Sequence, residues 1–373
     1  MVSELKVMKA VVIEGDRAVV SSSVPVPPLA KDMLRIKVKA VAVNPTDWKH
    51  VSFKIGPQGS ILGCDVAGEI VEVGADVKNF KVGEVVYSAV HGASVKHPEN
   101  GGFAEYSLLD PQLTLKVPGG GHLSGKDSIP LGPVQSIEGA VSLPVSLITA
   151  GLVFHYHLGL KTEWQPRQVQ VEKPLLIWGG ATAVGQMLIQ LAKKLNGYSK
   201  IIVVASRKHE QQLKSLGADE LFDYHDEDVV EQIKSKHKDL PYLIDAVSSA
   251  ESFVNVYRLG NTDKPTKLIQ LTTMSEEQIP EKERNPHVKV EGAVLYLITG
   301  LDVPFGRFNL PADPACRAAA IEFVRFIGPK VADGEINHIP LKVFHNGLED
   351  IPVAMNKIKN GENSNVKYIV TLQ

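Results

Sequence analysis

Short apolar runs rich in valine and isoleucine, separated by glycine and proline, fill the first third of the chain. Runs of this kind between turn residues are typical of β-strands. We therefore expect a β-rich unit built from a rolled antiparallel sheet. The predicted strands are residues 8–14, 18–21, 34–43, 65–73, 85–89 and 104–109.

From Pro174 onward the apolar pattern changes, because short buried-type strands now alternate with amphipathic helices. Such alternation predicts a parallel, doubly wound α/β sheet. The predicted strands are residues 175–178, 201–205, 220–224, 242–247 and 267–271, and the helices are 184–195, 209–216 and 228–236. The tail adds helices at 315–327 and 351–360 and strands at 339–344 and 367–372.

Length and composition narrow the class of protein. A chain of 373 residues exceeds what one core usually organises, which favours two domains. The 40 basic and 42 acidic residues nearly balance, so nothing indicates a nucleic-acid partner. The two cysteines and the lack of an apolar leader or membrane-length run favour a cytoplasmic protein without a membrane partner, with a nuclear location left open.

A strand, a small-residue turn and a helix follow one another over residues 174–195. In the turn, Gly180 and Gly185 take the outer places of a G-x-G-x-x-G pattern, and Thr182 takes the middle place. Amide groups at the start of such a helix can bind a pyrophosphate, which predicts dinucleotide binding by residues 180–185, with Ala181, Ala183 and Val184 between the named positions. The alternative is an ordinary βα turn.

The second strand of this region ends in Ser206, Arg207 and Lys208, where NAD-binding proteins carry an acidic residue. A hydroxyl with two cations suits a 2′-phosphate, which a carboxylate would repel. We therefore predict NADPH as the cofactor; the alternative is a pair of solvated surface cations.

Several phrases resemble the medium-chain dehydrogenase/reductase superfamily, in its zinc-free, quinone-oxidoreductase-like part. They include Leu62-Gly-Cys-Asp-Val-Ala-Gly, Gly102-Phe-Ala-Glu-Tyr and the nucleotide turn, and they span nearly the whole chain. The turn and the strand end are similar to a fungal branch with aldehyde-reductase-like proteins and trans-acting enoyl reductases. The resemblance implies a GroES-like catalytic domain, residues 1–148 and 312–373, with a Rossmann domain, residues 149–311, inserted and the active site in the cleft.

The resemblance also bears on metal binding. Zinc alcohol dehydrogenases place Cys, His and Cys ligands at positions that match Asn44, Cys64 and Val145. Because valine cannot bind zinc and an amide is a poor substitute for a thiolate, we expect no catalytic zinc.

Individual site residues follow from matching positions. The resemblance implies cofactor contacts for Thr46 and Lys49 near the nicotinamide, for Thr149, and for Tyr224 beside the adenosine phosphate. Each has a structural alternative: a surface cation, a helix hydroxyl bonded to its own backbone, or a strand-end aromatic. We also place Leu271 among the cofactor-binding residues.

The predicted reaction is NADPH-dependent hydride transfer to aldehydes or other activated carbonyls. The alternatives are enoyl or quinone reduction and a non-catalytic NADPH-binding protein. The candidate catalytic proton donors are Lys49 and Tyr87, with ordered water as a third source. The expected partner is a small-molecule aldehyde, enone or quinone.

The apolar stretch at 292–300 and the following 302–306 are either a substrate-side loop or an edge strand with its connection. Pro304 and Pro311 follow this expected edge strand, and proline disfavours pairing at a sheet edge. We therefore favour a monomer over a homodimer.

Overall fold

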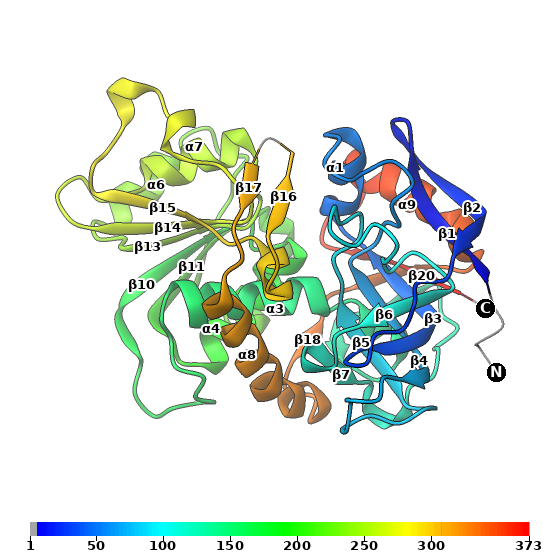
Figure 1. Cartoon of the computed structure of the whole chain (residues 1–373). Coiled ribbons are helices and arrows are strands. Elements are labelled where there is room, and N and C mark those ends of the chain that lie inside the picture. Colours follow the sequence, from blue (N-terminus) through cyan, green and yellow to red (C-terminus); the bar gives the residue numbers. More distant parts are fainter. Residues whose placement is uncertain (1–5, 307, 373) are drawn as a thin grey trace. The chain divides into compact units, whose positions relative to one another are not determined.

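The structure is a computed structural model that describes residues 6–306 and 308–372. Contacts divide the chain into two units (Figure 1). The first unit holds the residues up to Val145 and those from Tyr296 onward, and the second holds Ser146 to Leu295. Residues 296–311, which the sequence analysis assigned to the Rossmann domain, thus cluster with the first unit, and the predicted domain boundaries at 148/149 and 311/312 stay a prediction.

A mixed, mainly antiparallel sheet organises the first unit, with strands in the order β7-β5-β4-β3-β20-β19-β8 and β6 also paired to β3. Its longest strands, β3 and β4, are mostly buried and rich in valine, isoleucine and alanine, and charged residues interrupt their apolar sequence. The strands are β3 (Leu34–Val43), β4 (Asp65–Val73), β5 (Val85–Ala89), β6 (Tyr106–Leu109), β7 (Thr114–Lys116), β8 (Ser128–Ile129), β19 (Leu341–Phe344) and β20 (Lys367–Thr371).

Three two-stranded sheets complete the strands of this unit in the described chain. They pair β1 (Val7–Glu14) with β2 (Arg17–Pro25), β9 (Gly132–Pro133) with β18 (Asn337–His338), and β16 (Val303–Phe305) with β17 (Phe308–Leu310). The helices are α1 (Pro45–Ser52), α2 (Ile137–Val141), α8 (Pro314–Ala332) and α9 (Asp350–Lys359), with short 3₁₀ turns η2 (Pro111–Leu113), η3 (Pro118–Gly120), η8 (Leu295–Thr299) and η9 (Gly347–Glu349), the first residue of η8 lying at the end of the second unit.

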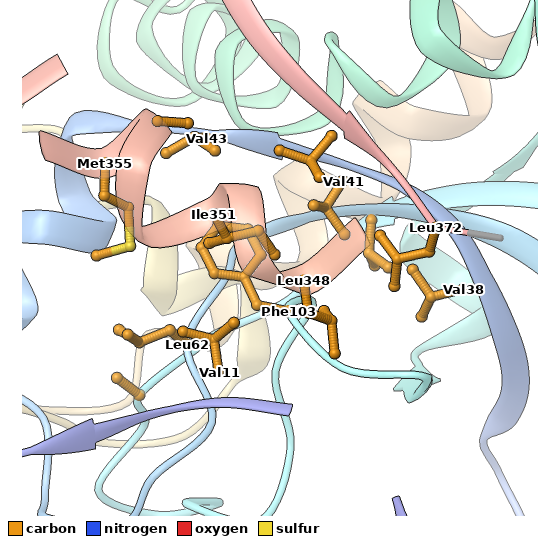
Figure 2. Close-up of a cluster of buried hydrophobic side chains, with 14 of the residues drawn as sticks. Val11, Val38, Val41, Val43, Leu62, Phe103, Leu348, Ile351, Met355 and Leu372 are labelled. Carbon is orange, nitrogen blue, oxygen red and sulfur yellow. The ribbon is translucent and has the colours of Figure 1, made fainter. Parts of the chain in front are cut away.

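The core of the first unit lies where α9 packs on β3 and β20. Figure 2 shows Ile351 and Met355 of α9 with Val41 and Val43 of β3 in one buried cluster. The helix presents its apolar residues at spacings of three and four, so one stripe faces the sheet.

A six-stranded parallel sheet organises the second unit, in the order β12-β11-β10-β13-β14-β15 (Figure 1). Numbered along the chain, the strand order is 3-2-1-4-5-6, which is the order of dinucleotide-binding sheets. Successive strands are added on one side of β10 up to β12 and on its other side from β13 onward, so the switch point lies between β10 and β13. The strands are β10 (Val171–Trp178), β11 (Tyr198–Val204), β12 (Glu220–Phe222), β13 (Tyr242–Asp245), β14 (Thr266–Gln270) and β15 (Val288–Gly292).

Helices cover both faces of this parallel sheet. One face packs Leu176, Ile202 and Leu243 against Ile233 of α6 and Phe253 of α7. The helices are α3 (Pro144–Leu152), whose first two residues belong to the first unit, α4 (Ala183–Lys194), α5 (Glu210–Leu216), α6 (Val229–Lys236) and α7 (Ala250–Arg258), with a π-helical turn η4 (Val153–His157) and 3₁₀ turns η5 (Arg207–His209), η6 (Glu276–Gln278) and η7 (Glu281–Glu283).

The predicted fold class, a β-rich unit with a doubly wound parallel sheet, is confirmed. Two local predictions are wrong. The edge strand ends at Gly292, and residues 295–299 form η8 instead of continuing a strand. The helix predicted to stop at 327 runs to Ala332, because Pro329 lies in its last turn and the Asp333 amide still reaches the Pro329 carbonyl. Within the described residues, no helix has the length and apolar character that crossing a membrane requires.

Candidate functional site

The turn between β10 and α4 has the geometry of a phosphate site. A Cβ atom at Gly185 would lie 2.2 Å from the Gly179 carbonyl oxygen, so only glycine lets the helix begin this close to the strand. Ala183 and Val184 occupy the first two helical positions, and within the described chain their amides have no carbonyl four residues back to accept them. These free amides at a helix N-terminus fit a dinucleotide pyrophosphate.

Thr182 caps this helix. Its hydroxyl accepts from the Gly185 amide (3.0 Å) and donates to the Gly179 carbonyl (2.8 Å). The hydroxyl proton is therefore used within the turn, and Thr182 shapes the turn through its cap of the helix.

The end of β11 is the position that selects the adenosine half of a dinucleotide. Ser206 is buried there, and no hydrogen bond of its hydroxyl is found in the described chain. The Arg207 amide donates to Asp223 Oδ2 (2.9 Å), while its guanidinium, 65% exposed, pairs with Asp226 at 3.3 Å. Lys208 is exposed.

Asp223 is a carboxylate that the sequence analysis did not weigh. Its second oxygen accepts from the His225 amide (3.1 Å) and from His225 Nδ1 (2.6 Å), and these bonds outweigh burial, which alone would raise its pKa, so the pKa lies below its usual range. One oxygen of Asp223 is thus engaged by Arg207 after β11 and the other by His225 after β12. Asp223 ties these two loops together, whereas Ser206 stays available.

The remaining predicted cofactor residues of the second unit lie on separate elements. Tyr224 follows β12, is about half exposed and stacks on His225 at 4.1 Å between ring centroids. Leu271 follows β14, and its amide donates to Ser248 Oγ (2.7 Å). Thr149 is buried in α3 without a hydrogen bond to its own backbone in the described chain, so its structural alternative is not realised. Their cofactor roles stay a prediction.

In the first unit, two of the three positions that match zinc ligands, Asn44 and Val145, are tied together by Asp65. Asp65 accepts the Asn44 Nδ2 (2.8 Å) and the Val145 amide (2.7 Å), and Lys367 Nζ pairs with it at 2.6 Å. Asp65 and Lys367 are 0% and 3% exposed, so the ion pair is buried. The group that organises these positions is an ion pair. In the described chain, no three His, Cys, Asp or Glu residues come together as a metal site.

A buried polar cluster adjoins these positions. The Tyr296 hydroxyl lies 2.5 Å from Thr46 Oγ1 and 3.5 Å from Cys64 Sγ. His91 stacks on the Tyr296 ring, with centroids 3.8 Å apart and planes 13° apart, and His50 meets it edge-on at 5.5 Å. We call Thr46, His50, Cys64, His91 and Tyr296 the tyrosine cluster.

Burial keeps this cluster close to neutral. It lowers the pKa of His50 to about 4 and that of His91 to about 3, so both imidazoles are uncharged at neutral pH. Burial, with a smaller effect of the Asp47 charge, raises the pKa of Cys64 well above its usual value, so the thiol stays protonated. Burial also raises the pKa of Tyr296 well above 10, which keeps its hydroxyl proton in place.

The two proton-donor candidates of the sequence analysis lie in different settings. Lys49 is half-buried on α1, its ammonium group 5.9 Å from the Trp48 ring centroid, and burial lowers its pKa. Tyr87 lies buried within β5, and it shares no hydrogen bond or ring contact with Thr46 or Cys64 in the described chain. Both roles stay predictions, and the structure brings only Thr46 into the tyrosine cluster.

Sequence reasoning missed Tyr296, His50 and His91. The first lies 250 residues from Thr46, and no local pattern links the two positions. A signal existed for α1, because Asn44 and Asp47 form a capping pair around Pro45, with the Asn44 amide donating to Asp47 Oδ2 at 2.7 Å.

A parallel sheet of order 3-2-1-4-5-6 with a glycine turn, in a chain that also carries a β-rich unit with a polar cluster, is typical of oxidoreductases that use a nicotinamide dinucleotide. Two family models match: the alcohol dehydrogenase GroES-like domain over residues 30–119 and the zinc-binding dehydrogenase over residues 183–278. The chain belongs to the medium-chain dehydrogenase/reductase superfamily, as the motifs predicted, and its β-rich unit contains the expected GroES-like domain.

Three relatives show how the chain compares within the superfamily. It is 56% identical over 368 residues to an uncharacterized protein of Saccharomyces cerevisiae, covering 98% of both chains. It is 32% identical over 362 residues to the trans-enoyl reductase RAP2 of Pyricularia oryzae, covering 95% of both. The enoyl reductase component lovC of the lovastatin nonaketide synthase of Aspergillus terreus is 28% identical over 369 residues, covering 96% of this chain and 94% of that one.

Solved structures share the fold. The quinone oxidoreductase of Coxiella burnetii superposes with a TM-score of 0.66 at 22% identity, covering 98% of this chain and 99% of that one. The CurK enoyl reductase gives 0.69 at 18% identity, with the same coverage. At these identities the similarity shows the fold alone.

Proposed function

We propose that this chain is an NADPH-dependent, zinc-independent reductase that transfers a hydride to aldehydes or other activated carbonyl compounds. The observation that carries the cofactor choice is the end of β11, where a buried serine with a free hydroxyl and two cations stand in the described chain at the position of an acidic residue. The residues that would hold the cofactor are Ser206, Arg207 and Lys208 at the 2′-phosphate, with the amides of Ala183 and Val184 at the pyrophosphate.

The cofactor, when bound, supplies the hydride, and the chain holds and neutralises the substrate oxygen. The tyrosine cluster supports a carbonyl substrate because it offers an uncharged hydroxyl donor next to the position matching a zinc ligand, Cys64. Zinc independence is supported by Val145, an apolar side chain at another of those positions.

A second candidate is the reduction of conjugated enoyl compounds. It is favoured by the full-length similarity to RAP2 and lovC, both of which are named as enoyl reductases.

We also keep the monomer prediction as a proposal, although the structural basis for it changes. The edge strand β15 ends at Gly292, and Pro304 pairs within the β16–β17 hairpin of the first unit.

The experiment measures kcat/KM for NADPH and NADH with metal-free protein and a panel of short aldehydes, enones and quinones. We expect NADPH to be preferred by about ten- to hundred-fold, since each charge-assisted hydrogen bond contributes roughly 1.5–3 kcal/mol. Ser206→Asp should reverse this preference by repelling the 2′-phosphate. Ser199→Asp, at the exposed opposite end of β11, is the matched control and should leave it unchanged.

The outcomes separate the candidates. Turnover of aldehydes supports the main proposal, and a clear preference for enones or quinones supports the second. NADPH binding without any turnover would leave the non-catalytic alternative, and equal use of NADH would contradict the assignment at Ser206.

A further inference from the structure

One proton near Tyr296 can be placed. His50 Nδ1 lies 2.9 Å from the Thr46 carbonyl oxygen, which can only accept, so Nδ1 carries the proton. The same nitrogen lies 3.2 Å from Thr46 Oγ1, which therefore accepts from it. Thr46 Oγ1 and the Tyr296 oxygen lie 2.5 Å apart, and either hydroxyl can donate to the other.

When Thr46 donates, the Tyr296 proton has no strong acceptor in the described chain. The other polar atom near its oxygen is Cys64 Sγ at 3.5 Å, and a thiol sulfur is a weak acceptor. When Tyr296 donates, the Thr46 proton is the one that their shared bond does not use. In either arrangement the pair keeps one hydroxyl proton that a substrate carbonyl oxygen can accept.

The His50 proton is already committed, because the Thr46 carbonyl oxygen accepts it. The ring of Tyr296 is fixed by the His91 stack and by Phe305, whose ring centroid is 6.2 Å away. A fixed ring presents its hydroxyl in one place, which is what a proton donor requires.

We propose that the Tyr296 hydroxyl is the proton donor of the reduction, with Thr46 and His50 as the residues that orient it. This inference rests on the proposed function. The cofactor, when bound, would supply a hydride to a substrate carbon, and the π electron pair would move to the carbonyl oxygen. The O–H bond of Tyr296 breaks as its proton passes to that oxygen, which gives an alcohol from an aldehyde or an enol, and then a ketone, from an enone. A proton taken up from solvent as hydronium restores the tyrosine, and the Thr46 hydroxyl stabilises the tyrosinate meanwhile.

The test is Tyr296→Phe, which keeps the ring and its stack on His91 and removes the hydroxyl. We expect kcat to fall about 100-fold or more, as for loss of a general acid, with an unchanged NADPH Kd. The matched control is Tyr198→Phe, because the buried Tyr198 hydroxyl has no hydrogen-bond partner in the described chain. A Tyr296→Phe kcat within threefold of the Tyr198→Phe value would overturn the proposal.

A second measurement needs no turnover. In the complex with NADP⁺, which has no hydride to give, calorimetry with benzaldehyde or cyclohexenone should show about two- to tenfold weaker binding for Tyr296→Phe than for Tyr198→Phe. Equal binding by the two variants overturns the proposal. If the wild type binds but turns nothing over, the proposed function fails while this comparison still decides on Tyr296.

If Tyr296→Phe lowers the melting temperature, 3-fluorotyrosine at position 296 keeps both the hydroxyl and the ring shape. Its more acidic phenol should change kcat and the effect of D₂O on kcat, whereas 3-fluorotyrosine at position 198 should change neither. Identical values at both positions would argue against proton donation by Tyr296.

Discussion

Lys367→Met tests whether the buried ion pair organises the first unit. Lys367 Nζ pairs with Asp65 at 2.6 Å and donates to the Ser142 carbonyl at 2.9 Å, and both charged side chains are almost fully buried. Methionine fills a similar volume without the charge, so Asp65 would stay buried with two neutral donors, Asn44 and Val145. Removing one partner of a buried pair costs about 3–5 kcal/mol, and we expect a loss of this size.

The assay is urea-dependent hydrogen exchange followed by mass spectrometry, because it reports the stability of β3, β4 and β20 separately from the second unit. Lys342→Met is the matched control. Lys342 is exposed on the neighbouring strand β19, so its loss should change stability by no more than about 0.5 kcal/mol. The double variant Lys367→Met with Asp65→Asn should recover part of the loss, since the amide carries no charge.

Two results would refute this reasoning. A loss below about 1 kcal/mol would mean that the pair is solvated in solution and behaves as a surface salt bridge. A double variant no more stable than Lys367→Met would mean that the uncompensated carboxylate is not the source of the loss.

Three further predictions concern single positions. Gly185→Ala places a Cβ 2.2 Å from the Gly179 oxygen, so it should destabilise the second unit by about 1–3 kcal/mol and abolish NADPH fluorescence enhancement. Gly132→Ala is the control, because no atom lies closer than 3.9 Å to its Cβ, and it should do neither. Retained NADPH binding by Gly185→Ala would contradict the tight turn. Thr182→Ala should cost about 1 kcal/mol in urea unfolding and Thr182→Ser much less, so equal losses would argue against capping. Burial raises the pKa of Asp47 from 3.8 to about 7, so the folded state holds a proton that the unfolded state has lost, and this group lowers wild-type stability as pH rises from about 4 to about 7. Asp47→Asn, which still accepts the Asn44 amide, should gain stability relative to wild type over that range by on the order of 1 kcal/mol per pH unit, and a difference that does not vary with pH would show that Asp47 does not titrate there.

Sequence reasoning located the parallel sheet because its strands are buried on both faces and read as continuous apolar runs, such as Leu175 to Trp178. It located the phosphate turn for a related reason: glycine at position 185 is required by a close backbone approach within one βα unit. Both signals come from residues close together in the sequence, so they can be recognised without knowing the fold.

The tyrosine cluster and the ion pair could not be found this way. Lys367 opens the last strand and reads as a solvated cation, and only its partner Asp65, 302 residues earlier, explains its burial. Tyr296 stands in an apolar stretch that reads equally well as an edge strand. The environments of Lys367 and Tyr296 are determined by contacts between segments that lie far apart in the sequence. These contacts cannot be predicted from one sequence without the fold.

In the proposed reaction, the two buried groups together would let the first unit bind a substrate oxygen without a charged ligand set. The charges of Asp65 and Lys367 neutralise each other, while Asp65 holds Asn44 and Val145 in place. The groups that fix these positions are therefore different from the hydroxyl proposed to donate the proton. The tyrosine cluster is uncharged at neutral pH, because burial keeps His50 and His91 deprotonated and Cys64 and Tyr296 protonated. In the proposed reaction, negative charge that develops on a substrate oxygen would meet the dipole of the Tyr296 hydroxyl. Preorganised dipoles of this kind need no reorganisation during the reaction, which makes a single well-placed hydroxyl sufficient for substrates that are already activated.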